Sequence, residues 1–282
     1  MATICGNPFP YGPKIASDEQ DEREEALAEI IEWLKKQTQF DEEDGQKLWY
    51  VLINGLWKTD MVLVQHSFCK KISAILFKIP QQFVKTFMST FFSGMAKQWG
   101  QLDKWRIEKF LVLVRYFLNT IIEWCQKNNE IEFLLQLFNE VLSLETGTGL
   151  QLQFIDVITE PLTKLIKENT KKNSKLAKPF FEVFSSATTK TGLVLRIHEK
   201  LVEPLINSDG EFFFGNDVEA SLNFFRYFIN ILNKSLKTPA EVVQQVLQLR
   251  YDVAAQVRLE IKTILEVQSQ LGKPAEKITT NE

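Results

Sequence analysis

The chain has 282 residues, of which 45% are hydrophobic and 24% are charged, and its formal net charge is −3. This length can bury a sizeable core, and the composition is that of an ordinary globular protein, which excludes an intrinsically disordered or membrane-embedded chain. The three cysteines are far apart and the N-terminal residues lack the basic-then-apolar pattern of a signal peptide, so we expect a reducing compartment and no secretion.

From about residue 18 onward, apolar residues recur at helical spacing, which predicts an all-α protein with essentially no sheet. Ser17 or Asp18 can cap a first helix that ends near Lys36 and carries many acids in its first turns. Asp41 can cap the second helix, and Pro80 can start the fourth, since proline is tolerated at a first helical position. The third and later helices are expected at 61–78, 81–99, 103–127, 130–144, 150–168, 174–187, 191–206, 216–235 and 239–271.

Long helices that follow one another with short connections predict an irregular HEAT/armadillo-like α-solenoid of about eleven helices. The chain has no clean internal repeat, so a closed, irregular helical bundle is the alternative. No linker rich in Pro, Gly or Ser divides it, which predicts a single helical domain over 17–271. Residues 1–16 are expected to be disordered or extended, and 272–282 to form a flexible tail.

Catalytic and metal-binding patterns are weak. His66 and Cys69 are three residues apart on one expected helix, but the only other histidine is His198, so no second ligand pair completes a metal site or a dyad. The Gly147–Gly149 segment lacks the Gly-Lys-Ser/Thr of a phosphate loop and is better explained as a chain reversal. We therefore expect no catalytic residue, no metal and no cofactor.

One stretch concentrates positive charge. Its six lysines are opposed only by Glu168: Lys164, Lys167, Lys171, Lys172, Lys175 and Lys178. They form either a solvated connection or an edge that contacts RNA phosphates. A weaker second patch comprises Lys70, Lys71, Lys78 and Lys85. Phenylalanines at helical spacing, such as Phe87 and Phe91, indicate core packing rather than base stacking.

Two blocks around tryptophans stand out. The first comprises Lys47, Trp49, Trp57, Asp60 and Gln65, and the second comprises Trp99, Asp103, Lys104, Arg106 and Lys109. Trp49 and Trp57 are eight residues apart, near enough to two helical turns to share a face. We expect them to lock the second helix to the third and fifth, so the roles of both blocks are mainly structural.

The fifth helix offers its own charge pairs. Asp103 with Arg106, three apart, and Lys104 with Glu108, four apart, can each support a helix by a few tenths of a kcal/mol. Arg115 interrupts the apolar run of this helix. It must reach water, pair with an acid or meet a partner, and an internal ion pair or a snorkelled position is favoured over RNA contact.

In order, spacing and residue type, the two blocks resemble the ribosomal RNA-processing protein 1 family over residues 15–206. Tyr50-Val51 and Met61-Val62 differ from the lysine–glycine and lysine–proline pairs usual there. The resemblance implies a non-catalytic nucleolar factor of large-subunit (pre-60S) precursors, needed for rRNA processing of the internal spacer and the 5.8S/large rRNA region.

The partners that this resemblance implies are pre-60S assembly factors and pre-rRNA, with no membrane and no small-molecule substrate. Lys164 to Lys178 and Arg115 are the candidate contacts for RNA or partners. The alternative is a HEAT-like protein-binding adaptor unrelated to ribosomes, which would share the helical pattern but not the two tryptophan blocks.

Overall fold

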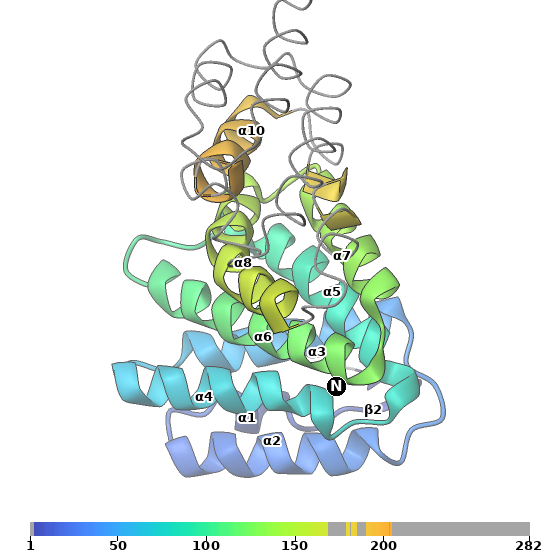
Figure 1. Cartoon of the computed structure of the whole chain (residues 1–282). Helices are drawn as coiled ribbons and strands as arrows, with labels where there is room; N and C mark the ends of the chain where they lie inside the picture. Colours follow the sequence, from blue (N-terminus) through green and yellow to red (C-terminus); the bar gives the residue numbers. More distant parts are fainter. Residues whose placement is uncertain (1–2, 169–178, 181, 185–189, 203, 205–282) are drawn as a thin grey trace, which may run out of the picture. The chain divides into compact units, whose positions relative to one another are not determined.

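The computed structural model of the chain describes residues 3–168, 179–180, 182–184, 190–202 and 204 (Figure 1). The chain divides into two compact units, Met1–Leu165 with Ala187–Arg196 and Ile166–Ser186 with Ile197–Glu282. The single helical domain expected over 17–271 stays a prediction. The helices expected at 216–235 and 239–271, and the tail 272–282, lie outside the described residues, as does most of 174–187.

The described residues are mostly helical, which confirms the all-α class. The helices are α1 (Gly12–Ile15), α2 (Gln20–Leu34), α3 (Glu42–Trp57), α4 (Val62–Ala74), the 3-10 turn η1 (Ile75–Phe77), α5 (Gln81–Trp99), α6 (Ile107–Asn128), α7 (Ile131–Ser143), α8 (Thr148–Glu168), α10 (Thr191–Ile197) and the π-helical η3 (His198–Val202). None of these described helices is both long and apolar enough to cross a membrane.

The N-terminal segment, expected to be disordered or extended, contains two short strands and a helical turn. β1 (Thr3–Ile4) and β2 (Asn7–Pro8) pair antiparallel through a tight turn, and α1 follows. Ile4 and Ile15 are fully buried, and the Cys5 N–H donates to Asp44 Oδ1 of α3 at 2.6 Å. These contacts offset the entropy of ordering a short segment that shows no sustained strand pattern.

Helix ends follow local chemistry. Asp41 caps α3 as expected, in a capping box in which its side chain accepts the Asp44 N–H and the Asp44 side chain accepts the Asp41 N–H. Pro80 is the N-cap of α5 rather than its first helical residue. The helix expected from 103 begins at Ile107, because the Asp103 side chain holds a separate turn before it. Asn129 ends α6 in the left-handed conformation.

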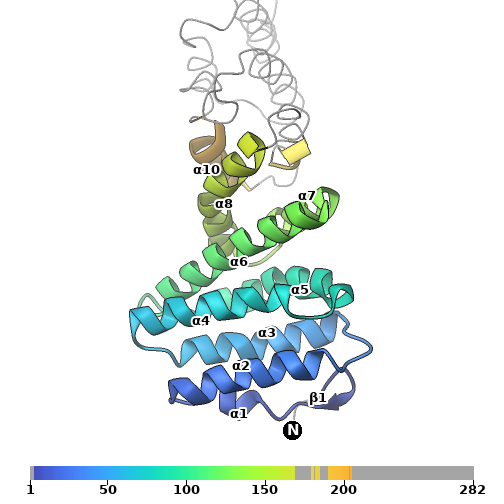
Figure 2. The ribbon, with the colours of Figure 1, turned by 60° about the horizontal axis from the view of Figure 1, so that its bottom comes forward.

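The helices of the first unit pack in two rows. α4 packs against α2 and α6, while α3 packs against α1 and α5, and α7 continues beside α5. Figure 2 shows these successive helices stacked on one another. Consecutive helices thus fall in alternate rows, and a HEAT/armadillo-like solenoid of about eleven helices stays a prediction.

The centre of this unit is aromatic. Trp49 of α3 is fully buried, and its ring lies 4.5 Å from Phe87, 4.7 Å from Phe91 and 4.8 Å from Phe117, measured between centroids. Its Nε1–H donates to the Phe87 carbonyl at 2.7 Å. Trp49 therefore locks α3 to α5 and α6, the fourth and fifth expected helices. The expected lock to the third helix is not made by Trp49, because α5 rather than α4 lies against this face of α3.

Candidate interaction surface

Lys109 joins the two tryptophan blocks. It lies in the first turn of α6 and is 5% exposed. Its Nζ donates to the carbonyl of Trp57 at 2.8 Å and to that of Thr59 at 2.6 Å. The last carbonyls of a helix have no donor within the helix. A lysine from α6 therefore caps the end of α3, fifty residues earlier in the chain.

The surroundings of Lys109 shift the pKa of its ammonium group in opposite directions. Burial lowers the pKa of its ammonium, and the carboxylate of Asp60 opposes that shift. The Cys69 thiol donates to the Lys109 carbonyl at 3.7 Å, and burial raises the pKa of this thiol to about 12. His66 is exposed, and its Nδ1 lies 3.4 Å from the Tyr116 hydroxyl instead. His66 and Cys69 thus have different partners, and the described residues contain no group of three side chains placed to bind a metal.

Gln65 fixes the connection between α3 and α4. Its Nε2 donates to the carbonyls of Thr59 at 3.1 Å and Asp60 at 3.3 Å. The Thr59 hydroxyl donates back to the Leu56 carbonyl at 2.7 Å, and Thr59 is fully buried. Side chains therefore satisfy the carbonyls of this loop. The first block builds one defined backbone path rather than a reactive centre.

The second block builds a matching turn between α5 and α6. Asp103 Oδ1 accepts from the N–H groups of Trp105 at 3.0 Å and Arg106 at 2.9 Å, and its Oδ2 accepts from Arg106 Nη1 at 2.7 Å. The expected pair of Asp103 and Arg106 is confirmed. The guanidinium of Arg106 also lies over the Trp57 ring, 4.7 Å from its centroid, so the two blocks meet in space.

The pair expected between Lys104 and Glu108 does not form. The Lys104 ammonium lies over the Trp105 ring, 4.9 Å from its centroid. Trp105 itself is 82% exposed. The turn that Asp103 caps delays the start of α6, and Lys104 consequently lies before the helix, out of the register that an i,i+4 pair needs.

Exposed apolar side chains gather around these two loops. Four of the six large hydrophobic side chains that are exposed in the described residues lie there: Met61 at 69%, Val62 at 64%, Leu63 at 81% and Trp105 at 82%. The N-terminal ends of α4 and α6 lie on the same side of the unit (Figure 1). We call the surface formed by residues 57–63 and 103–109 the motif edge.

The other candidate residues are dispersed. Lys47 forms an ion pair with Glu43 at 2.8 Å, and Trp99 is half-buried against Gly149. Arg115 is exposed and has no ion pair in the part of the chain that the structure describes, so it reaches water. Lys164 is exposed on α8. The side chain of Lys167, and all of Lys171, Lys172, Lys175 and Lys178, lie outside the described residues, so the lysine stretch stays a prediction.

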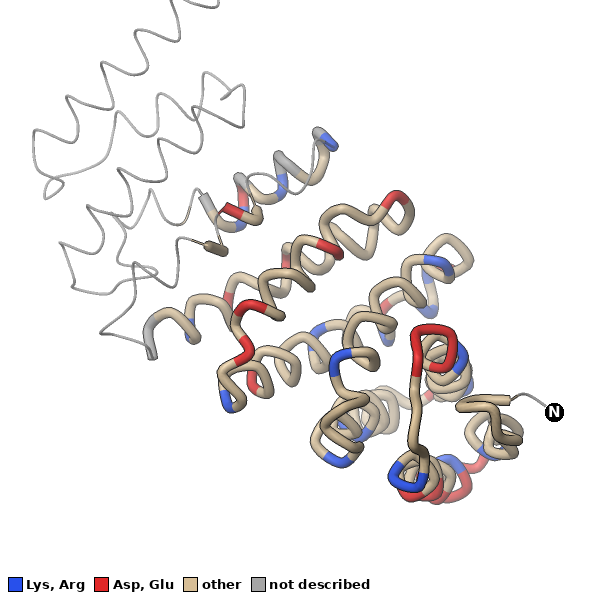
Figure 3. The backbone as a smooth tube through the Cα atoms, turned by 90° about the vertical axis from the view of Figure 1, so that its right-hand side faces the viewer, with Lys and Arg blue, Asp and Glu red and all other residues tan. Residues whose placement is uncertain are grey.

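Acidic charge gathers elsewhere in the first unit. α2 carries Asp21, Glu22, Glu24, Glu25, Glu29 and Glu32, and Figure 3 shows this concentration at the bottom of its view. Some of these carboxylates are paired, for example Glu29 with Lys14 at 2.9 Å and Glu24 with Lys71 at 2.5 Å. The crowding of acids that the sequence predicts for the first helix is confirmed. Asp18, just before this helix, pairs with Lys58 of the motif edge at 3.8 Å.

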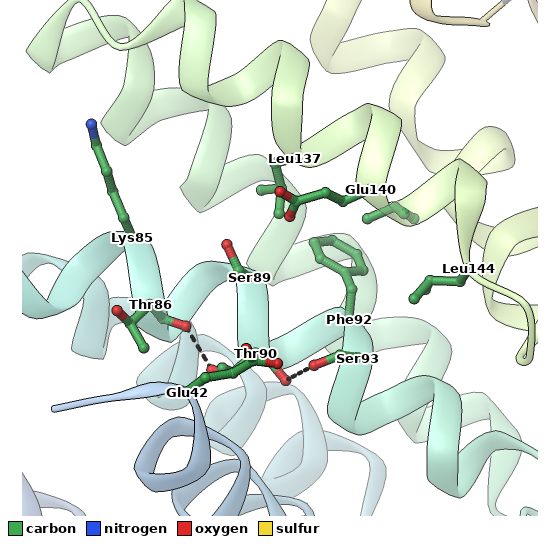
Figure 4. A pocket seen from close by; sticks show the side chains of 11 residues that line it. Glu42, Lys85, Thr86, Ser89, Thr90, Phe92, Ser93, Leu137, Glu140 and Leu144 are labelled. Atoms are coloured by element: carbon green, nitrogen blue, oxygen red, sulfur yellow. Dashed lines mark hydrogen bonds between the residues drawn. The ribbon is translucent and has the colours of Figure 1, made fainter. Parts of the chain in front are cut away.

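A groove between α5 and α7 was missed by sequence reasoning. Its volume is about 490 Å³, and Glu42 at the start of α3 contributes to its lining. Figure 4 shows Phe92 and Leu137 on its apolar side and the Ser89 hydroxyl directed into it. The nearby ammonium of Lys85 pairs with Glu130 at 2.8 Å. Its lining comes from three helices that are far apart in the sequence, so no local pattern could have identified it.

Comparisons of this chain with known proteins support the family resemblance of the two tryptophan blocks. A family model described as the nucleolar protein Nop52 matches residues 8–217. Ribosomal RNA processing protein 1 homolog B of Mus musculus is 26% identical over 216 residues, covering 71% of this chain and 29% of the relative. Homolog A of Homo sapiens is 28% identical over 210 residues, which cover 67% of this chain and 45% of the relative. The homolog of Caenorhabditis elegans is 21% identical over 214 residues, which cover 71% of this chain and 53% of the relative.

The chain spans less than a third of the length of the mouse relative. The match to the family model nevertheless covers well over half of this chain, including the whole motif edge. The resemblance inferred from the two tryptophan blocks is thereby confirmed, and with it a nuclear, nucleolar location. The chain belongs to the Nop52 family of nucleolar proteins, and its curated relatives are named as ribosomal RNA processing protein 1 homologues.

Proposed function

We propose that this protein is a ribosome biogenesis factor that acts in rRNA processing on large-subunit (pre-60S) precursors. It would be required for processing of the internal spacer and the 5.8S/large rRNA region. The observation that carries this proposal is the family match over residues 8–217, together with relatives named for ribosomal RNA processing. The protein would work as a non-catalytic scaffold that holds assembly factors and pre-rRNA in place.

The chemistry of the motif edge supports a scaffold. Its most buried polar side chains, Lys109 and Thr59, bind backbone carbonyls, and Asp103 binds backbone N–H groups. Groups used in this way fix the shape of a surface and are poorly placed to transfer a proton to a substrate. The stacked rows of helices, extended into a HEAT/armadillo-like solenoid, would offer long faces to several partners at once.

Direct contact with pre-rRNA belongs to the same proposal. The six lysines from Lys164 to Lys178, with Arg115, would bind phosphates and orient the RNA. If all six lysines contact phosphates, log affinity should fall with log salt concentration at a slope of roughly −4 to −5. A flat response in RNA-binding assays at several salt concentrations would assign these lysines to solvated surface.

Sedimentation tests the proposal most directly. Tagged full-length protein is separated on sucrose gradients, and each fraction is probed for the internal spacer and the 5.8S/large rRNA region. We expect the protein to sediment with those precursors, and depletion of the protein to make them accumulate. A matched gradient after nuclease treatment should shift the protein to light fractions. A protein that stays in light fractions throughout, with normal precursor levels, would instead be a helical adaptor unrelated to ribosomes.

A further inference from the structure

The motif edge exposes more apolar surface than its own fold requires. Trp105 and Leu63 are each more than four-fifths exposed, and Met61 and Val62 adjoin Leu63. Elsewhere in the described residues only Tyr50 and Phe77 are large, apolar and exposed, and they lie on other elements. A concentrated apolar patch on a soluble surface marks a site that a partner covers.

This patch is held on a rigid frame. Lys109 and Gln65 bind the loop carbonyls next to Met61, and Asp103 binds the backbone N–H of Trp105. The guanidinium of Arg106 on the Trp57 ring joins the two loops. Since the backbone is already ordered, a partner would not have to order it on binding, which favours affinity.

The charges beside the patch indicate the chemistry of the partner. Leu63, His66 and Lys70 follow one face of α4 at helical spacing, and His66 contacts Tyr116, the neighbour of Arg115 on α6. Lys70, Lys104 and Arg115 are exposed and have no carboxylate partner in the described part of the chain. The acids of the motif edge are Glu108, which is also unpaired, Asp103, which pairs with Arg106, and Asp60, which faces the charge of Lys109. The unpaired charge is therefore mainly positive.

We infer that the motif edge, with the adjoining face of α4 and α6, docks an acidic segment of a partner protein that carries apolar anchor residues. The anchors cover Leu63 and Trp105, and carboxylates of the segment pair with Lys104, Arg115 and Lys70. Three adjacent aliphatic side chains, Met61 to Leu63, suit a protein partner better than unpaired bases, which need open aromatic faces. This inference goes beyond the proposed function and does not depend on ribosomal precursors.

Selection from a random peptide library on the immobilised full-length protein tests the inference. The wild type, Leu63→Ser, Trp105→Ala and Lys104→Glu are compared, with Tyr50→Ser as the matched control because Tyr50 is an exposed apolar residue of α3 away from the edge. All the substituted side chains are exposed, so thermal unfolding of each variant should match the wild type.

We expect the wild type and Tyr50→Ser to enrich peptides that combine Asp or Glu with large apolar residues. The best peptide should bind Leu63→Ser and Trp105→Ala about tenfold more weakly or worse, and Lys104→Glu more weakly at low salt. Enrichment of basic peptides, no enrichment, or peptides that bind the edge variants as well as the wild type would overturn the inference. Binding of a single-stranded RNA probe that Trp105→Ala abolishes and Leu63→Ser leaves unchanged would assign the edge to RNA instead.

Discussion

Two lysines perform a similar task in different parts of the first unit. Lys109 of α6 binds the carbonyls of Trp57 and Thr59 at the end of α3. Lys190, just before α10, binds the carbonyl of Leu144 at 2.6 Å, after the end of α7, and that of Glu145 at 3.2 Å. Each ties together segments at least 45 residues apart. Each also supplies donors to a helix end that has none of its own.

The two ties differ in exposure. The Leu144 carbonyl also receives the Gln151 amide, and the Thr59 carbonyl also receives the Gln65 amide, each at 3.1 Å. Among the described residues, Lys109 is the sole donor to the part-buried Trp57 carbonyl, and Lys190 is the sole side-chain donor to the exposed Glu145 carbonyl. Lys109 is buried, while Lys190 is half-buried and lies within reach of water. Each lysine thus has one acceptor that a glutamine shares and one that it alone binds, and the two ties differ in how far that second acceptor is exposed to water.

Replacing Lys109 by methionine should have the largest effect. Lys109→Met keeps most of the apolar stem but leaves the part-buried Trp57 carbonyl without a donor and removes the buried hydrogen bond to the Thr59 carbonyl. Since the lost hydrogen bonds come from a charged group, we expect the free energy of unfolding to fall by about 3 kcal/mol. Urea denaturation followed by circular dichroism measures it. Lys104→Met, at an exposed position nearby, is the control and should change stability by less than about 0.5 kcal/mol. Equal losses of unfolding free energy in Lys109→Met and Lys104→Met would show that the hydrogen bonds of Lys109 to α3 add no stability beyond that of an exposed lysine.

The sequence predicted much of the helical frame. The bounds of α5 agree with the expectation of 81–99, and the aspartate expected to cap the second helix does so. The buried ring positions Phe87 and Phe91 also follow from their spacing. These features depend on neighbours within one or two turns, which a local pattern records directly.

What the sequence could not supply is the partner of each polar side chain. Lys109 is flanked by Glu108 and Phe110, and nothing local distinguishes it from a solvated lysine, because its acceptors lie fifty residues away. Lys104 was expected to pair with Glu108 for the same local reason and contacts Trp105 instead. Position in the family blocks identified these residues as important, and only the fold shows what they do.

Removing Gln151 should have the second largest effect. Gln151 is fully buried, and its Nε2 donates to the carbonyls of Val141 and Leu142, both at 2.9 Å, as well as to Leu144. Gln151→Leu removes the side-chain donor of the Leu142 carbonyl and leaves the Val141 carbonyl with only the Leu144 N–H, at 3.4 Å, so we expect a loss of about 2 kcal/mol. Gln136→Leu, an exposed position on α7, serves as the control in the same denaturation experiment. If the Gln151 variant matched that control, the end of α7 would not need its side-chain donors.

Lys190→Met should cost less, about 1 kcal/mol, because the Leu144 carbonyl keeps Gln151 and water can reach Glu145. The loss in the double variant with Gln151→Leu should differ from the sum of the two single losses, since the two side chains share the Leu144 carbonyl and Lys190 Nζ also donates to Gln151 Oε1 at 3.0 Å. A double-mutant cycle measures this coupling. Strict additivity of the two losses in unfolding free energy would show that Lys190 and Gln151 stabilise the end of α7 independently of each other.

The smallest expected effect is on the pH dependence of the free energy of unfolding. It separates the contribution of the Lys109 charge from that of its hydrogen bonds. Its pKa is lowered by burial from the ordinary value of 10.5, so the unfolded chain holds this proton more tightly than the folded one. Stability linked to Lys109 should therefore rise with pH between the lowered pKa and 10.5, because the unfolded state releases its proton later. The neutral amine still has two N–H donors, enough for both carbonyls.

The difference in unfolding free energy between the wild type and Lys109→Met isolates this contribution. The three buried thiols, whose pKa values burial raises to about 12, lower the stability of both proteins alike as pH rises above 9.0, and they cancel in the difference. We expect the gap between the two proteins to widen toward pH 10.5 and then level off. A gap that narrows would mean that the positive charge of Lys109 itself stabilises the end of α3, and that burial of this cation carries no net cost.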